Sequence, residues 1–188
     1  FGRRNMNVAP AEVTDIVMYQ IGALEAFCRA NGIAMQHVKP HGAMYNMAEK
    51  DEKLAEAICQ GIKAVNPDLI LLGPGSGKMV KAAKALGLKT AGEVFADRAY
   101  MEDGTLVPRS QEGAMITDEE EAVARVLEMV QKGTVTAITG KKIAVQADSI
   151  CVHGDGQKAL LFVQKIRSEL EKAGVVIAPM KEVIVGES

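Results

Sequence analysis

Two hydrophobic patterns alternate along the chain: stripes with apolar residues three or four positions apart, and short continuous apolar runs. The stripes predict amphipathic helices, and the runs predict buried strands. Helices are expected at 10–31, 54–65, 77–86, 117–130 and 159–173, and strands at 33–38, 69–72, 88–95, 149–152 and 175–178. Because strands and helices alternate, the pattern predicts a parallel sheet with helices packed outside it, either open or as an incomplete barrel.

Local signals place several of the helix ends. Pro10 is suited to a first helical turn, and Asn66 before Pro67 stops the second helix. Thr117 and Glu120 form a capping box, so their side chains are expected to bond first-turn amides. The β-rich segment 134–145 is ambiguous and contains a predicted turn at residues 140–142.

Unusual polar residues follow three of the predicted strands. They are Lys39, His41, Tyr45 and Asn46 after the first, Glu93, Asp97 and Arg98 around the end of the third, and His153 and Asp155 after the fourth. The carboxyl ends of parallel strands meet at one edge of a sheet, where α/β proteins build their sites. The sequence therefore predicts that these side chains converge on one mouth.

Histidine usage supports this prediction, because two of the three histidines, His41 and His153, precede a glycine in such turns. Imidazole can exchange a proton near neutral pH or bind a metal, although a single loop histidine often only bonds backbone carbonyls. Glu93 and Asp97 could act as a general base, as metal ligands or as ion-pair partners of nearby cations. Arg109 could bind a carboxylate or lie in solvent.

A glycine-rich turn at 73–78 invites comparison with a phosphate-binding loop. That motif requires glycine at position 72 and Ser or Thr at position 79, where this chain has Leu72 and Met79. The pattern therefore argues against a nucleotide loop of this type. Free amides at the start of the predicted helix 77–86 could still hold an anion.

Composition narrows the class of protein. The 188 residues, 20.0 kDa and 48% hydrophobic residues fit one domain with a sizeable core. The 22 basic and 24 acidic residues are mixed along the chain, which gives no reason to expect nucleic acid or an anionic membrane and favours a small ligand. Three scattered cysteines and the lack of a long apolar run predict reduced thiols in a soluble cytoplasmic protein.

Three motifs together resemble the LamB/YcsF family. They are the segment Val38–Asn46, the segment Glu93–Tyr100 followed by Asp103, Gly104 and Arg109, and the segment Cys151–Asp155. The resemblance covers the whole chain. It implies an irregular seven-stranded (β/α) barrel similar to that of NodB-type carbohydrate deacetylases. Phe1-Gly2-Arg3-Arg4 matches the end of the family's N-terminal region, so the first strands are expected to be missing.

The resemblance also implies an activity, the opening of the lactam of 5-oxoproline to glutamate with hydrolysis of ATP to ADP and phosphate, together with partner subunits B and C. His41, Glu93, Asp97, His153 and Asp155 are then the expected catalytic residues. Lys39, Tyr45, Asn46, Arg98 and Arg109 are the expected substrate-binding residues. Self-association is left open.

Two alternatives to this activity remain. The first is a metal-dependent deacetylase or amidase, in which His41, His153 and Asp155 would be ligand donors for a divalent metal, although their spacing matches no compact metal motif. The second is a non-catalytic scaffold for partner subunits, which helix patterns cannot distinguish from an enzyme.

Overall fold

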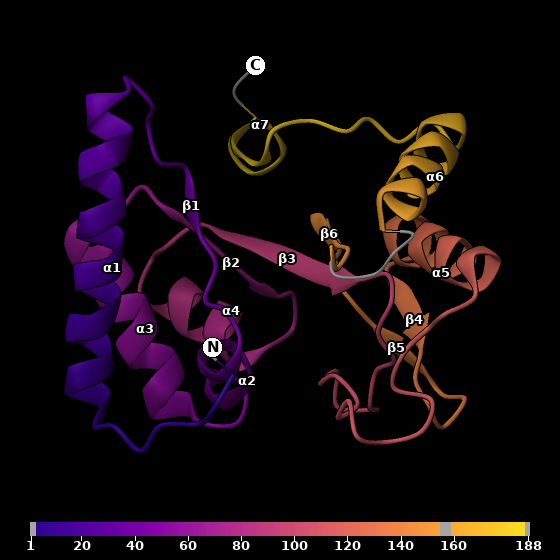
Figure 1. Ribbon diagram of the computed structural model, residues 1–188, viewed down its shortest axis with the longest axis horizontal. Coiled ribbons are helices and arrows are strands. Elements are labelled where there is room, and N and C mark those ends of the chain that lie inside the picture. Colours follow the sequence, from indigo (N-terminus) through magenta and orange to yellow (C-terminus); the bar gives the residue numbers. More distant parts are fainter. Residues whose placement is uncertain (1–2, 155–158, 187–188) are drawn as a thin grey trace.

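The sheet that organises the fold has four parallel strands in the order β1-β2-β3-β6 (Figure 1). The computed structural model describes residues 3–154 and 159–186. The strands are β1 (His37–Val38), β2 (Ile70–Pro74), β3 (Thr90–Phe95) and β6 (Ser149–Cys151). The first is shorter than predicted, because residues 33–36 approach it as irregular chain and Ile33 is exposed.

Three helices cover one face of this sheet. They are α1 (Pro10–Ala30), α3 (Glu52–Val65) and α4 (Lys78–Ala85), and each agrees with a predicted stripe. α1 packs on α3, α3 on α4, and α4 on β2 and β3. Alternate residues of a strand face opposite sides, so Leu71 and Val94 lie in the core with these helices.

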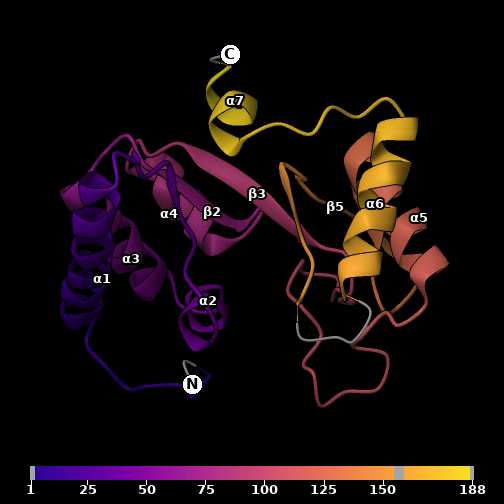
Figure 2. The ribbon, with the colours of Figure 1, turned by 45° about the horizontal axis from the view of Figure 1, so that its top comes forward.

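A second group of helices lies beyond β6. α5 (Glu119–Lys132) packs against α6 (Ala159–Lys172) and against β4 (Thr134–Thr136), which forms an antiparallel hairpin with β5 (Lys142–Ala144). In Figure 2 the sheet runs between the α1 and α3 group and the α5 and α6 group. The predicted turn within 134–145 is therefore confirmed as the turn of a hairpin.

The predicted cap of α5 is wrong by one residue. Asp118, not Thr117, is the N-cap, and its carboxylate accepts a hydrogen bond from the Glu121 amide at 2.8 Å. Both residues are good caps, and a charged carboxylate at the positive end of the helix dipole has the advantage over a hydroxyl.

The opposite face of the sheet is partly covered by α7 (Met180–Val185). Met180 and Ile184 pack against Ile70, Leu72 and Ala91. The predicted strand at 175–178 is wrong, because this segment is irregular and Val176 is 85% exposed. β-branched residues favour a strand only where neighbours can pair with it and cover it. None of the strands in the described parts of the chain pairs with this segment.

The parallel α/β organisation is thus confirmed, with an open sheet of four strands and a separate hairpin in the described ranges 3–154 and 159–186. One continuous buried cluster joins residues from Val13 in α1 to Leu170 in α6. The closed seven-stranded form stays a prediction.

Candidate active site

The carboxyl ends of β1, β3 and β6 bring charged side chains from three segments together. Lys39 follows β1, Asp97 follows β3 and His153 follows β6, and all these strands run in the same direction. Glu93 lies within β3, opposite Pro74 on one side and Ser149 on the other. The arrangement follows from parallel pairing, which places equivalent strand ends at one edge.

Glu93 is the buried centre of the first half of this site. Only 4% of the residue is exposed, and its two carboxylate oxygens have different partners. Oε1 forms an ion pair with Lys39 Nζ, and Oε2 accepts a hydrogen bond from the Tyr45 hydroxyl at 3.0 Å. A carboxylate buried in this way is stable only when it is paired and hydrogen-bonded, and both conditions are met.

Tyr45 reaches Glu93 from α2 (Ala43–Ala48), the short helix that follows the His41 turn. Burial, and then the charge of Glu93, raise the pKa of Tyr45 well above its ordinary value of 10. Its hydroxyl therefore stays protonated and acts as a donor.

Asp97 and His153 form the second half of the site. Asp97 Oδ2 lies 2.7 Å from His153 Nδ1, and the two side chains are 14% and 24% exposed. An ionised carboxylate can only accept, so a neutral His153 paired with it donates from Nδ1 and keeps its lone pair on Nε2. The other oxygen, Asp97 Oδ1, is buried and has no hydrogen-bond partner among the described residues.

The ring of Phe95 lies between the two halves. It stacks on the imidazole of His153 with ring centroids 6.0 Å apart, and it meets the Tyr45 ring edge-on at 6.1 Å. Lys39 Nζ is 5.8 Å from the centroid of the same ring and 3.7 Å from Cys151 Sγ. Burial is the main cause that raises the pKa of the Cys151 thiol to about 11, so it is protonated at neutral pH.

Several predicted site residues are not part of these contacts. His41 is exposed, and Asn46 uses its side-chain amide to donate to the Gly42 carbonyl at 2.9 Å. Arg98 is buried and donates to the Val107 carbonyl at 2.6 Å. Asp155 lies outside the described residues.

Arg109 is exposed beside Arg98. Burial lowers the pKa of Arg98, and the nearby positive charge of Arg109 lowers it further. Two arginines that repel one another can share an anion between them. The binding of a carboxylate or phosphate by these two residues stays a prediction.

The glycine turn at 73–78 does not offer a free anion site, and this prediction was wrong. The carboxylate of Glu49, from the end of α2, accepts from the amides of Lys78 at 2.8 Å and Met79 at 3.2 Å. A Cβ at Gly77 would lie 2.0 Å from Glu49 Oε2. The turn therefore accommodates a carboxylate of the protein itself.

Comparison with known proteins identifies the relationship. The LamB/YcsF family model matches residues 1–185. The chain belongs to the LamB/YcsF family.

Two similar relatives of this LamB/YcsF chain are both named as A subunits of 5-oxoprolinase. It is 62% identical to the 5-oxoprolinase A subunit of Clostridium beijerinckii, over 97% of this chain and 72% of the relative. It is 51% identical to the 5-oxoprolinase A subunit of Bacillus subtilis, over 97% and 71%. The crystal structure of a lactam utilization protein from Thermus thermophilus superposes with a TM-score of 0.85 at 43% identity, covering 93% of this chain and 70% of that one.

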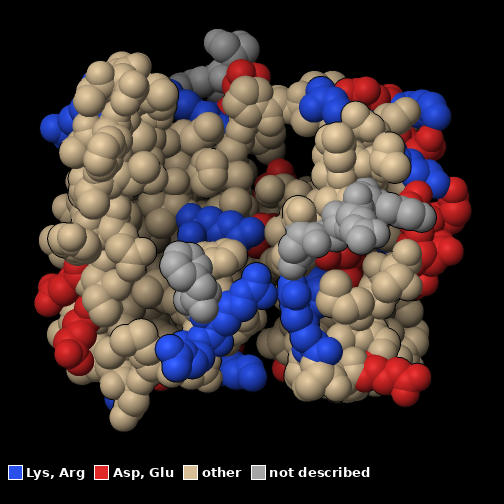
Figure 3. All heavy atoms as spheres, in the orientation of Figure 1, with Lys and Arg blue, Asp and Glu red and all other residues tan. Residues whose placement is uncertain are grey.

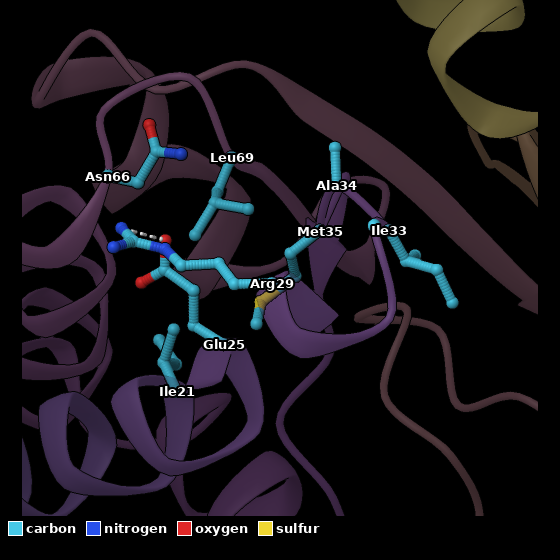
Figure 4. A pocket seen from close by; sticks show the side chains of 9 residues that line it. Ile21, Glu25, Arg29, Ile33, Ala34, Met35, Asn66 and Leu69 are labelled. Atoms are coloured by element: carbon cyan, nitrogen blue, oxygen red, sulfur yellow. Dashed lines mark hydrogen bonds and ion pairs between the residues drawn. The ribbon is translucent and has the colours of Figure 1, made fainter. Parts of the chain in front are cut away.

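Two hollows of this LamB/YcsF chain lie at the other end of the sheet. One of about 360 Å³ is lined by the end of α1, the approach to β1 and Leu69, and Figure 4 shows Arg29 paired with Glu25 inside it, 2.8 Å apart. Another of about 730 Å³ lies between the approach to β1 and α7. Arg29 and Glu25 in Figure 4 are thus already paired with each other. The ion pairs of Lys39 with Glu93 and of His153 with Asp97 lie at the opposite, carboxyl edge of the sheet.

In Figure 3 Lys and Arg side chains lie on both sides of the hollow between the α1 and α3 group and the α5 and α6 group, and Asp and Glu side chains also reach it. Among the described residues no helix is long and apolar enough to cross a membrane, and no group of three His, Cys, Asp or Glu side chains could hold a metal ion.

Sequence reasoning missed Phe95 and Glu49. Phe95 has the same orientation in β3 as Glu93, two residues before it, so strand alternation could have placed it beside the site. No local signal marks Glu49, because its role depends on how α2 packs beside the start of α4.

Proposed function

We propose that this chain is the A subunit of an ATP-dependent 5-oxoprolinase, which opens the lactam of 5-oxoproline to L-glutamate together with subunits B and C. The names of its relatives and of the Thermus structure support the substrate class. The observation that carries the chemistry is the contact between Asp97 and His153 beside the buried pair of Lys39 and Glu93.

The reaction makes four demands on a site. A five-membered lactam is a poor electrophile, so its carbonyl must be activated. A base must take a proton from the attacking water, an acid must give a proton to the leaving nitrogen, and a cation must hold the substrate carboxylate. Transfer of the γ-phosphoryl group of ATP to the amide oxygen would meet the first demand and release ADP, and two water molecules then yield glutamate and phosphate.

His153 is suited to the proton transfers. Asp97 holds Nδ1, so Nε2 can take a proton from water and later return it to the nitrogen released when the C–N bond breaks. The free oxygen Asp97 Oδ1 is a candidate acceptor for the lactam N–H. This assignment replaces direct activation of water by Asp97 with orientation of His153 by Asp97.

Lys39 is the candidate electrostatic group. Its ammonium has three protons, of which one faces Glu93 and another Cys151, and the side chain is 30% exposed. The remaining N–H can donate a hydrogen bond to the substrate oxygen that becomes negative during attack. Glu93 and Tyr45 would keep this ammonium in place.

Substrate and partner groups complete the proposal. Arg98 and Arg109 would hold the substrate carboxylate or a phosphate. His41 and Asn46 remain candidate site residues, as does Asp155, which lies outside the described residues. ATP is consumed by the complex, and a divalent metal would accompany it as ATP ligand. We take residues 1–188 as one domain of a seven-stranded barrel of the NodB-like type; the buried cluster that joins α1 to α6 supports the single domain.

The test is ATP-dependent release of glutamate by the chain assembled with subunits B and C. His153→Asn should lower kcat by about 100-fold or more, since positioned acid–base groups contribute about 10² to 10⁴. His37→Asn is the matched control, because His37 lies within β1 and has no proposed role.

Assembly must be measured in parallel, by size-exclusion chromatography of the three subunits. The scaffold alternative predicts loss of assembly with activity per complex unchanged. A His153→Asn variant that assembles normally and retains wild-type turnover would refute the proposed function.

A further inference from the structure

We propose that Phe95 is a positioning residue, whose ring fixes the plane of His153 and the position of Lys39 relative to one another. The inference rests on the proposed function, because it assigns Phe95 to the same site. The Phe95 side chain has no group that can take part in proton transfer or hydrogen bonding, so it would act only by positioning its neighbours.

Phe95 contacts side chains from three separate segments. His153 comes from the segment after β6, Tyr45 from α2, and Lys39 from the segment after β1. Phe95 belongs to the main buried cluster, and an imidazole, a phenol and an ammonium also lie beside its ring. An ammonium about 6 Å from a ring centroid is attracted by the negative face of the ring.

The orientation of His153 requires a second constraint. The hydrogen bond from Nδ1 to Asp97 Oδ2 fixes one atom of the imidazole, and the ring can still rotate about that bond. Stacking on Phe95, with an angle of 21° between the ring planes, fixes the plane. Together the two contacts determine where Nε2 points.

The backbone of Phe95 is fixed by hydrogen bonds at the end of β3. Tyr100 is 4% exposed, and its hydroxyl accepts a hydrogen bond from the Phe95 amide at 2.9 Å. The amide of Ala96 donates to the Cys151 carbonyl at 3.2 Å, which ties the end of β3 to β6. Phe95 is therefore anchored through its backbone on the strand that also carries Glu93 and leads to Asp97.

The experiment compares Phe95→Leu with Phe95→Tyr in the assembled complex. Leucine removes the ring and keeps apolar bulk, and tyrosine keeps the ring. Phe162→Leu in α6 is the control for the general cost of the same substitution at a partly buried site. We expect Phe95→Leu to lower kcat by about 10- to 100-fold with a change in KM below about threefold, since small misplacement of a catalytic group acts mainly on the transition state.

Phe95→Tyr should recover kcat to within about threefold of wild type, and Phe162→Leu should leave kcat unchanged. Thermal unfolding should show a somewhat larger loss for Phe95→Leu than for Phe162→Leu, because Phe95 is buried and Phe162 only partly so. A folded Phe95→Leu variant with wild-type kcat would overturn the inference, as would a folded Phe95→Tyr variant as slow as the leucine variant.

An NMR measurement on the wild-type chain needs no folded variant at Phe95. The chain has only three histidines, so the ring protons of His153 can be assigned by their loss in His153→Gln. We expect nuclear Overhauser contacts between these protons and an aromatic ring. Their absence in the folded chain would overturn the inference even if every Phe95 variant failed to fold.

The two proposals fail in different ways. Wild-type turnover in His153→Asn would refute the proposed function, whatever Phe95 does. Loss of turnover in His153→Asn with full turnover in Phe95→Leu would refute only the role of Phe95.

Discussion

The mouth and the glycine turn at 73–78 both follow strands at the same edge of the sheet, and both contain residues suited to binding anions. At the glycine turn the anion is Glu49, which uses the amides of Lys78 and Met79. At the mouth Lys39 and His153 are held by Glu93 and Asp97 but keep bonding capacity of their own. A polar motif is thus a candidate site only where the fold leaves some of its bonding capacity unused.

The largest expected effect comes from Glu93→Ala. Removing one partner of a buried ion pair leaves the other uncompensated, so we expect a loss of about 3 kcal/mol in the free energy of unfolding, near the low end for such pairs because Lys39 is partly exposed. Glutamate release should fall by about 100-fold or more, as when an electrostatic group is removed. Chemical denaturation and turnover of the assembled complex measure the two effects.

Glu93→Gln is the matched variant, since it keeps an acceptor for Tyr45 and loses only the charge. It should retain more stability than Glu93→Ala and still lose turnover. Normal turnover in either variant would show that the Glu93 cluster, like the glycine turn, is structural and not catalytic.

The second prediction applies the same change to the glycine turn. Glu49→Ala removes an acceptor from two first-turn amides of α4, which should cost about 1 to 2 kcal/mol, the range for loss of a helix cap. Turnover of the assembled complex should stay at the wild-type level. A loss of turnover as large as that of Glu93→Gln would show that Glu49 belongs to the site.

The third prediction tests whether Gly77 and Glu49 act together. A Cβ at Gly77 would push the Glu49 carboxylate away from the amides, so Gly77→Ala should cost about 1 kcal/mol. In the double variant the two costs should overlap by about 0.5 kcal/mol or more, because the same contact is lost twice. Additive losses in chemical denaturation would mean that Gly77 is required for another reason.

The smallest expected effect is a dependence on pH at the glycine turn. Burial is the main cause that raises the pKa of Glu49 above its ordinary value of 4.5. The folded chain therefore binds this proton more tightly than the unfolded chain, and the contribution of Glu49 is greatest below pH 4.5 and declines as the pH rises through the folded pKa. The stability of wild type relative to Glu49→Gln should fall over this range, and a rise would contradict the assignment.

Pattern alone could predict that Lys39, Glu93, Asp97 and His153 approach one another, because parallel strands bring equivalent ends to one edge. It could not predict which charges pair, since Arg98 is adjacent to Asp97 in sequence and yet bonds the Val107 carbonyl. Pairing depends on strand register and on side-chain direction after the strands end. The contact of Glu49 with the glycine turn could not be predicted for a similar reason, because Glu49 lies at the end of another helix, α2.

Gly42 is a position at which substitution should damage the fold although the residue has no side chain in the site. Its φ of 64° and ψ of −125° at the start of α2 suit a residue without a side chain, and its turn allows Lys39 and Tyr45 to reach the same carboxylate. In a mutational scan Gly42 would rank among the least tolerant positions. Loss of activity in Gly42 variants would result from altered backbone geometry. A mutational scan would therefore overestimate the number of residues that contact the substrate.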